Sequence, residues 1–155
     1  MASILVAGAV VAQHTEPVWR DKSDFVIAAP LGDGGSEIEQ LFVRQISDHR
    51  FELCCVPFFL YDVALGDVVE TDDTYLMREV VERSGRYVFR VWFGDTAYPR
   101  EDIANSLVEL GGLLEWSSVN LLAIDAEDLV QAQKIADYLA IASDEGKLMF
   151  ETGRS

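Results

Sequence analysis

The densest group of chemically versatile side chains in this sequence is a run of carboxylates with no basic residue between them. Its members are Asp62, Asp67, Glu70, Asp72 and Asp73. Carboxylates this close in sequence can bind a divalent cation or supply a general acid and a general base. Their spacing lacks the ligand order of a calcium-binding loop, and acids are common in turns such as those expected at Gly66 and at residues 72–73. We therefore predict no metal site and no catalytic pair here.

A thiol and an imidazole are the other groups in this sequence that support catalysis. The combination to consider is Cys54 or Cys55 with His49 and Asp62. The two cysteines are adjacent in an expected strand, where their side chains leave on opposite faces and cannot readily bond each other. No signature of a thiol nucleophile surrounds them. We expect reduced, buried cysteines, a protein that is not an enzyme, and no cofactor.

Aromatic and basic side chains alternate along the expected strand 86–93. One face, which we interpret as core, carries Tyr87, Phe89, Val91 and Phe93. The other face carries Arg86, Val88, Arg90 and Trp92. An indole between arginines is enriched in protein interfaces. The same face also suits packing of one half of the chain against the other, and both interpretations stay open.

Runs of β-branched and aromatic residues predict about six strands before the first helix. We expect them at 24–30, 39–46, 50–56, 66–71, 75–83 and 86–93, with a hairpin turn at 47–49. The glycine-rich segment 31–39 is expected to be a connecting loop, because no Lys-Ser or Lys-Thr pair follows it as in a phosphate-binding loop.

Two amphipathic helices are expected in the last third of the chain. The first begins at Pro99 and ends at Gly111 and Gly112, and its apolar face carries Ile103, Leu107 and Leu110. The second is expected to be capped by Asp125 and to end before Gly146. Its apolar face would carry Leu129, Ala132, Ala136 and Leu139.

The order of these elements predicts the fold class. Residues 113–125 form one long strand or a hairpin turning at Ser117 and Ser118; with the hairpin, residues 86–151 follow the β-α-β-β-α-β order of a ferredoxin-like unit. We predict an α+β fold in which N-terminal antiparallel strands, forming a small open barrel or sheet, precede a ferredoxin-like half with two helices. The expected divisions are 1–18, an extension or extra strand that contains His14, then a β-rich half at 19–85 and a helical half at 86–155 that share one core.

The strongly negative net charge of the chain argues against some classes of binding partner. The chain carries 27 acids and 12 bases, a formal net charge of −15. A phosphate backbone would be repelled by such a field, so we do not expect nucleic-acid binding. The apolar run 4–12 is too short to span a membrane and lacks the positive flank of a secretory signal. We expect a cytoplasmic protein without a membrane anchor.

Several motifs are similar to those of a known family. They are VPFFLYDVALGDVVE, then REVVERSGRYVFRVWF, and finally LLEWSSVNLLAIDA with ETGRS. Over roughly residues 19–155 the chain resembles the bacterial family catalogued as domain of unknown function 4265, and it looks most like the actinobacterial branch. The resemblance implies no established activity, cofactor or site residue.

Two hypotheses of function remain. The first is a binding protein whose acidic surface meets a basic protein, such as a toxin domain that it neutralises, as immunity proteins of similar size and acidity do. The residues expected to contact this partner are Trp92, Arg90, Arg86, Asp67, Glu70, Asp72 and Asp73. The alternative is a small-molecule sensor or regulatory domain, whose ligand would be held by Ser117, Ser118 and Asn120.

Overall fold

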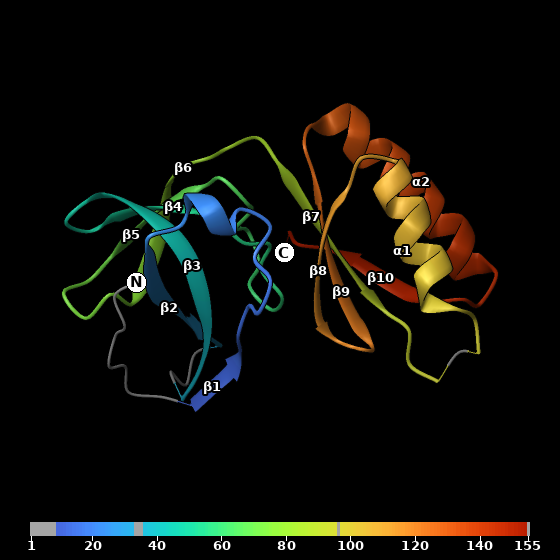
Figure 1. The fold of residues 1–155 in the computed structure, drawn as a ribbon, viewed down its shortest axis with the longest axis horizontal. Helices are drawn as coiled ribbons and strands as arrows, with labels where there is room; N and C mark the ends of the chain where they lie inside the picture. The colour runs from blue at the N-terminus through green and yellow to red at the C-terminus, as the bar shows by residue number, and fades with distance from the viewer. Residues whose placement is uncertain (1–8, 33–35, 96, 155) are drawn as a thin grey trace.

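The computed structural model describes residues 9–32, 36–95 and 97–154, which form two halves lying side by side (Figure 1). The first, the β half, contains β1 (Ala9–Ala12), β2 (Phe25–Leu31), β3 (Glu37–Ser47), β4 (Arg50–Leu53), β5 (Val68–Thr71) and β6 (Met77–Glu82). Strand β3 pairs antiparallel with β2 and with β4, and β5 and β6 continue the antiparallel meander. Strand β1 adds to β3 in the parallel direction.

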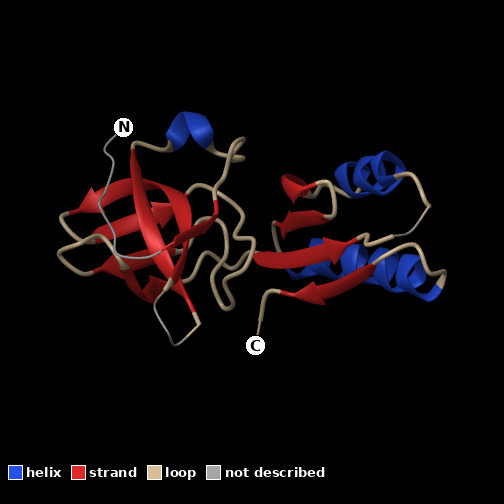
Figure 2. Ribbon diagram, turned by 90° about the horizontal axis from the view of Figure 1, so that it is seen from below, coloured by secondary structure: helices blue, strands red, loops and turns tan. Residues whose placement is uncertain are grey.

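The sheet of the β half is curved but does not close into a barrel. A single bridge between Ala28 and Leu76 brings β2 beside the start of β6. A short 3-10 helix, Arg20–Lys22, is the one helical turn described in this half (Figure 2). The sequence predicted an open barrel or sheet of antiparallel strands, and the structure confirms it.

The second, the helical half, follows the predicted β-α-β-β-α-β order. Its elements are β7 (Tyr87–Trp92), α1 (Arg100–Glu109), β8 (Leu113–Ser118), β9 (Leu121–Ala126), α2 (Leu129–Asp144) and β10 (Met149–Thr152). The strands lie in the order β10-β7-β9-β8, and every neighbouring pair is antiparallel. Strands β8 and β9 form the predicted hairpin, but the turn lies at Val119 and Asn120, two residues beyond the predicted pair.

Both helices begin and end close to the predicted residues. Pro99 is the N-cap of α1, and Gly111, with a φ of 91°, follows its C-cap residue Leu110. Gly112 lies so close to the core that a Cβ there would sit 3.0 Å from a methyl group of Ile124. The sequence therefore uses the glycine pair both to end the helix and to allow this close contact.

The predicted cap of α2 was wrong by three residues. Asp128, not Asp125, is the N-cap, and its carboxylate accepts the backbone N–H of Gln131 at 2.9 Å. Asp125 belongs to β9 and is fully buried, and its carboxylate pairs with Arg86, the residue directly before β7. The apolar face of α2 is also rotated from the predicted one: Leu129 is 65% exposed and Ile135 is buried.

Two predictions about the β strands need correction. Strand β4 ends at Leu53, so Cys54 and Cys55 lie beyond the strand and both are buried. Hydrogen bonds from the following loop to buried carboxylates replace the strand ladder there. Seven strands, not six, precede α1 in the described residues, because β1 was expected only as one alternative for the N-terminal segment.

The four-stranded sheet of the helical half is the middle layer of the molecule. Helices α1 and α2 cover the face that points away from the β half (Figure 1). On the opposite face, Val88, Leu121 and Ala123 pack against residues of the β half that include Val56, Phe58 and Ala64. The face of β7 that carries Trp92 therefore packs the halves together, one of the two roles that its sequence left open. No helix in the described part of the chain is long and apolar enough to cross a membrane.

Candidate functional site

A buried ion cluster lies where the two halves meet. His14 donates from Nδ1 to Glu115 Oε1 at 2.7 Å and from Nε2 to Glu39 Oε2 at 2.8 Å. Glu39 comes from β3 of the β half and Glu115 from β8 of the helical half. The ring of Phe58 stacks on the imidazole with centroids 4.1 Å apart. The N-terminal segment thus places one cation between a carboxylate of each half.

The two carboxylates of this cluster also bind the loop that follows β4. Glu39 accepts the backbone N–H groups of Phe58 and Phe59, each at 2.9 Å. Glu115 accepts the N–H of Val56 at 2.5 Å. Buried charges are stable only when paired and hydrogen-bonded, and here both conditions are met. The cluster therefore fixes the loop, the N-terminal segment and both sheets in one arrangement.

The electrostatics of the cluster favour a permanent imidazolium. Burial alone lowers the pKa of His14, but its hydrogen bonds to the carboxylates of Glu115 and Glu39 oppose that effect and, together with Cys55, raise the pKa above its ordinary value of 6.5. Burial raises the pKa of the Cys55 thiol, so the sulfur is neutral at pH 7 and the carboxylates supply the negative charge. An imidazolium cannot act as a general base, and a neutral buried thiol is a poor nucleophile. The geometry of this cluster is suited to holding the two halves together.

Two arginines of β7 and its preceding loop strengthen the same junction. Arg86 donates Nε and Nη2 to the carboxylate of Asp125 at 2.7–3.2 Å. Burial raises the pKa of Asp125, and the Arg86 guanidinium opposes that rise. Arg90 is 1% exposed, donates Nη2 to the carbonyl of Leu60, and lies 3.6 Å from Glu151. We call these pairs, together with His14, Glu39 and Glu115, the junction.

The structure places three of the predicted partner-binding residues inside or beside this junction. Arg86 is paired with Asp125, Arg90 is buried with one hydrogen bond through Nη2, and Trp92 is half-buried against the cluster that joins the halves. Asp67 is 1% exposed, and its carboxylate accepts the N–H groups of Ala64 and Ser84. In this arrangement Arg86, Arg90 and Asp67 form hydrogen bonds within their own chain. Their role toward a partner stays a prediction.

The remaining carboxylates of the predicted cluster lie apart from the junction. Glu70 faces Arg50 across the sheet at 3.3 Å, and Asp72 holds the turn before β6 through Thr74 and Leu76. Asp73, at the tip of that turn, lies 3.2 Å from His49. Within the described residues no group of three or more His, Cys, Asp or Glu side chains is arranged to hold a metal ion.

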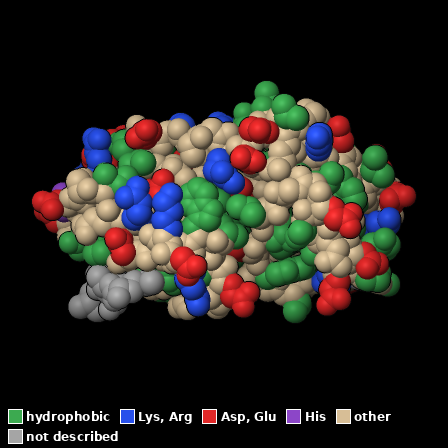
Figure 3. Space-filling view, turned by 45° about the horizontal axis from the view of Figure 1, so that its top comes forward, with side chains coloured by type: hydrophobic (Ala, Val, Ile, Leu, Met, Phe, Trp, Pro, Cys, Tyr) green, Lys and Arg blue, Asp and Glu red, His purple; other side chains and the backbone are tan. Residues whose placement is uncertain are grey.

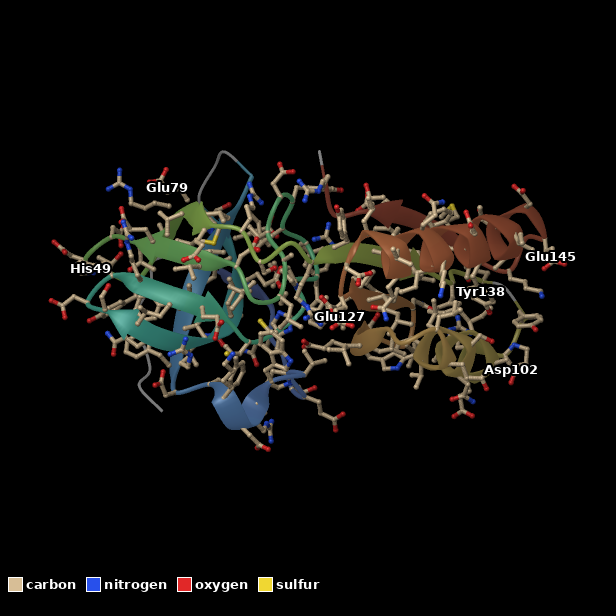
Figure 4. All side chains as sticks on the ribbon, turned by 90° about the horizontal axis from the view of Figure 1, so that it is seen from above. His49, Glu79, Asp102, Glu127, Tyr138 and Glu145 are labelled. Atoms are coloured by element: carbon tan, nitrogen blue, oxygen red, sulfur yellow. The ribbon has the colours of Figure 1, made fainter. Side chains whose placement is uncertain are left out.

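The thiol and imidazole set that the sequence offered is not assembled. His49 lies at the far end of the β half (Figure 4). Cys54 and Cys55 are fully buried, and Cys55 belongs to the core cluster of the β half. Burial raises the pKa of Cys54 to about 12, so this thiol is neutral as well. The nearest imidazole partner of Cys55 is His14, which the sequence did not indicate.

The residues proposed for a small ligand lie at the end of the β8–β9 hairpin. Ser118 lines an open hollow of about 300 Å³ together with Arg100, Glu101, Trp116 and Val119. Arg100 Nη2 donates to the side-chain amide oxygen of Asn120 at 2.6 Å, and the backbone N–H of Asn120 donates to the Ser118 hydroxyl at 3.2 Å. Ser117 does not line this hollow. The three residues therefore do not converge on a common ligand position.

The solvent-facing surface of the helical half is strongly acidic. Residues 100–146 carry eight exposed acids, namely Glu101, Asp102, Glu109, Glu127, Asp128, Asp137, Asp144 and Glu145. Two bases, Arg100 and Lys134, accompany them. Exposed aliphatic side chains lie among them: Val108, Leu129, Val130 and Ile141 are 56–67% exposed. We call this surface the helical face; Figure 3 shows acidic and hydrophobic side chains intermixed over this half.

Sequence reasoning did not find His14, Glu39 and Glu115. A signal was present for the glutamates, since each lies beside large apolar residues in an expected strand, where an exposed charge is unusual. No local signal joins them to His14, because 25 and 101 residues separate the partners.

Comparisons with known proteins agree with this fold. The profile of a family described as a domain of unknown function (DUF4265) matches residues 39–150. A solved structure titled as a novel crystal structure of a hypothetical protein from Neisseria gonorrhoeae superposes with a TM-score of 0.69 and 19% identity, over 83% of this chain and 93% of that one. At this identity the likeness establishes the fold alone. No curated protein matches the chain.

Proposed function

The chain belongs to the DUF4265 family, whose function is unknown, and we propose from its own surface that it is a non-enzymatic binding protein whose helical face docks a basic protein. The observation that carries this proposal is how few of the eight acids on that face form ion pairs. Within the described residues only Glu145 among them forms an ion pair, with Lys147 at 3.1 Å. The other seven carboxylates have charge to offer a partner.

The physical consequence of such a surface is selectivity and speed of association. Unpaired carboxylates steer a basic protein toward the face and repel acidic ones. The exposed aliphatic groups among them, such as Val108 and Ile141, supply apolar area that a partner can remove from water. A basic partner with apolar side chains between its lysines and arginines fits this combination, and the catalytic domain of a toxin acting in the cytoplasm is one such partner.

Two charge-reversed variants test which acidic surface binds. The first changes Glu109, Asp137 and Asp144 to Lys on the helical face. The second changes Asp48, Glu79 and Glu82 to Lys on the β half; Figure 4 shows Glu79 at its far end. All six side chains are exposed, so both variants alter net charge equally without disturbing the core.

The measurement is capture of partners from lysate of the source organism at low and moderate salt, quantified by mass spectrometry. We expect a stoichiometric basic protein bound by the unmodified chain, weakened by salt, retained by the β-half variant and lost by the helical-face variant. Loss only in the β-half variant would transfer the site to the acids around Glu70, Asp72 and Asp73. Equal capture by both variants would refute the proposal.

A further inference from the structure

Trp116 on β8 is the most exposed of the three tryptophans in the chain, at 39%. Its ring stacks on the buried ring of Phe93, with centroids 5.7 Å apart. The indole is therefore held in place by packing and still offers aromatic surface to solvent. An ordered tryptophan loses little side-chain entropy when a partner covers it, and tryptophans are among the residues that contribute most to binding.

The indole borders two hollows, and an exposed acid lines each of them. Trp116 and Glu101 both line the hollow of about 300 Å³ described above. A second hollow, of about 80 Å³, is lined by Trp116 and Glu16. Within the described residues neither carboxylate forms an ion pair. An aromatic ring with carboxylates beside it attracts a cation through the ring quadrupole and through formal charge.

Arg100 also lines the larger hollow, but its donors are directed at the neighbouring turn. Its Nε donates to the carbonyl of Val119 at 2.7 Å, and its Nη2 donates to the carbonyl of Gly94 at 2.9 Å and to the side chain of Asn120 at 2.6 Å. The same guanidinium lies 5.3 Å from the centroid of the Phe93 ring. The chain thus already places one guanidinium against this aromatic pair, and the exposed indole offers a similar surface to a second.

We propose that the hollow beside Trp116 receives an arginine side chain of the basic partner, a step that rests on the function proposed above. A guanidinium stacks on an indole and donates in its own plane to a carboxylate, whereas a lysine ammonium acts as a point charge. Trp116 supplies the ring and Glu101 supplies the carboxylate, so one arginine side chain can use both. This contact anchors the partner at the edge of the helical face.

The position of the hollow fits a partner that lies on the helical face. Glu101 is in the first turn of α1 and is one of the eight acids of that face. An arginine bound at Trp116 therefore brings the surface of the partner alongside α1 and its other exposed acids. Val119, which is 75% exposed, lines the same hollow and can pack against the aliphatic stem of the arginine.

A short basic peptide tests this site directly. The probe is acetyl-hexa-arginine amide, added to the isotope-labelled full chain at about 0.15 M salt, and the readout is the indole N–H signals in NMR spectra. The three tryptophans give one such signal each, and Trp116→Leu identifies the signal of Trp116. We expect the peptide to shift the Trp116 signal most. Hexa-lysine should bind about twofold more weakly or less well still, because it lacks the planar guanidinium.

Two substitutions test the ring and the carboxylate separately. Trp116→Leu should weaken hexa-arginine binding about fivefold, as measured from the backbone amide signals. Glu101→Gln should weaken it about threefold. Glu109→Gln is the matched control, because it removes one exposed carboxylate from the other end of the same helix, and it should weaken binding by less than about twofold. Since Glu101 is exposed, its variant tests the site even if Trp116→Leu does not fold.

A larger shift at Trp19 or Trp92 than at Trp116 overturns the proposal, and so does equal weakening by Glu101→Gln and Glu109→Gln. Capture of a basic protein from lysate separates this failure from failure of the proposed function. Capture that the helical-face variant loses, but that Trp116→Leu and Glu101→Gln both retain in full, refutes the anchor and leaves the proposed function standing. No captured basic protein, together with the expected shift at Trp116, refutes the proposed function and leaves the hollow as an arginine-binding site.

Discussion

The junction and the helical face use ionisable side chains in opposite ways. At the junction, His14, Glu39 and Glu115 are 3–4% exposed or less, and their charges are bound to each other and to backbone groups. On the helical face, eight acidic residues are exposed, and one of them has an ion-pair partner within the described residues. Carboxylates thus stabilise the contact between the halves at the junction, whereas those of the helical face are exposed to solvent.

We therefore expect the stability of the fold to depend on the buried charges of the junction and not on the exposed charges of the helical face. Buried ions are costly to desolvate, so removing one partner leaves the other uncompensated. Exposed ions are already solvated, so their removal costs the fold little. The net charge of −15 therefore reflects the solvent-facing acids, and the junction contributes to it only weakly because it is internally balanced.

The largest effect should follow from Glu39→Ala. This change leaves the His14 imidazolium with one carboxylate and frees the N–H groups of Phe58 and Phe59 in a buried site. We expect the free energy of unfolding, measured with urea, to fall by about 3–5 kcal/mol. Glu37→Ala, an exposed acid on the same strand, is the control and should change it by less than about 0.5 kcal/mol. A loss of under about 1 kcal/mol for Glu39→Ala would contradict the role given to the junction.

Next in size is the comparison of a buried ion pair with an exposed one. Arg86→Ala leaves the fully buried carboxylate of Asp125 without its partner, and we expect a loss of about 2–3 kcal/mol in unfolding free energy. Arg50→Ala breaks an exposed pair with Glu70 and should cost about 0–1 kcal/mol. Equal losses in the two variants would mean that burial does not distinguish these pairs.

A pH dependence isolates His14 itself. Its pKa is raised from 6.5 to about 12 on folding, so the folded chain binds a proton that the unfolded chain releases above pH 6.5. The stabilisation from His14 is therefore complete below pH 6.5 and declines as pH rises toward 12. Relative to His14→Gln, the wild-type unfolding free energy should fall by about 1.4 kcal/mol per pH unit between about pH 7 and 8.5. Parallel curves for the two proteins would exclude a buried imidazolium.

The smallest effect is expected on the helical face. Glu109→Gln and Asp144→Asn each remove one exposed carboxylate that has no ion pair in the described structure. We expect thermal unfolding to shift by no more than the equivalent of about 0.5 kcal/mol in either direction. A marked destabilisation would show that this face supports the fold, and would weaken its assignment to partner binding.

The sequence predicted the helical half well because its signals are local. Pro99, the glycine pair after Leu110 and the apolar spacing of Ile103 and Leu107 lie within one helix, and the structure confirms that helix. The error at Asp125 has a tertiary cause: Asp125 pairs with Arg86, and Asp128 caps the helix instead. Arg86, which is distant in sequence, therefore determines which aspartate caps α2.

The junction was beyond sequence reasoning for the same reason. Glu39 and Glu115 read as strand residues, and His14 falls in a segment whose place in the fold was left open. The contact of His14 with Glu39 and Glu115 depends on how the two sheets face each other. The spacing of apolar residues along the sequence does not predict that orientation. Partner binding was assigned to residues 67–73 and 86–92; the structure buries Asp67 and Arg90 and pairs Arg86 with Asp125, and the role of these residues toward a partner stays a prediction.

The position of His14 also determines the order in which the chain can complete its fold. During synthesis the N-terminal segment emerges first, yet its partner Glu115 is made 101 residues later. The β half can form its strands before then, but the histidine between β1 and the short 3-10 helix has only one of its two carboxylates until β8 exists. Contacts this distant in sequence slow folding. We therefore expect the cluster around His14 to be completed only when the helical half docks onto the β half.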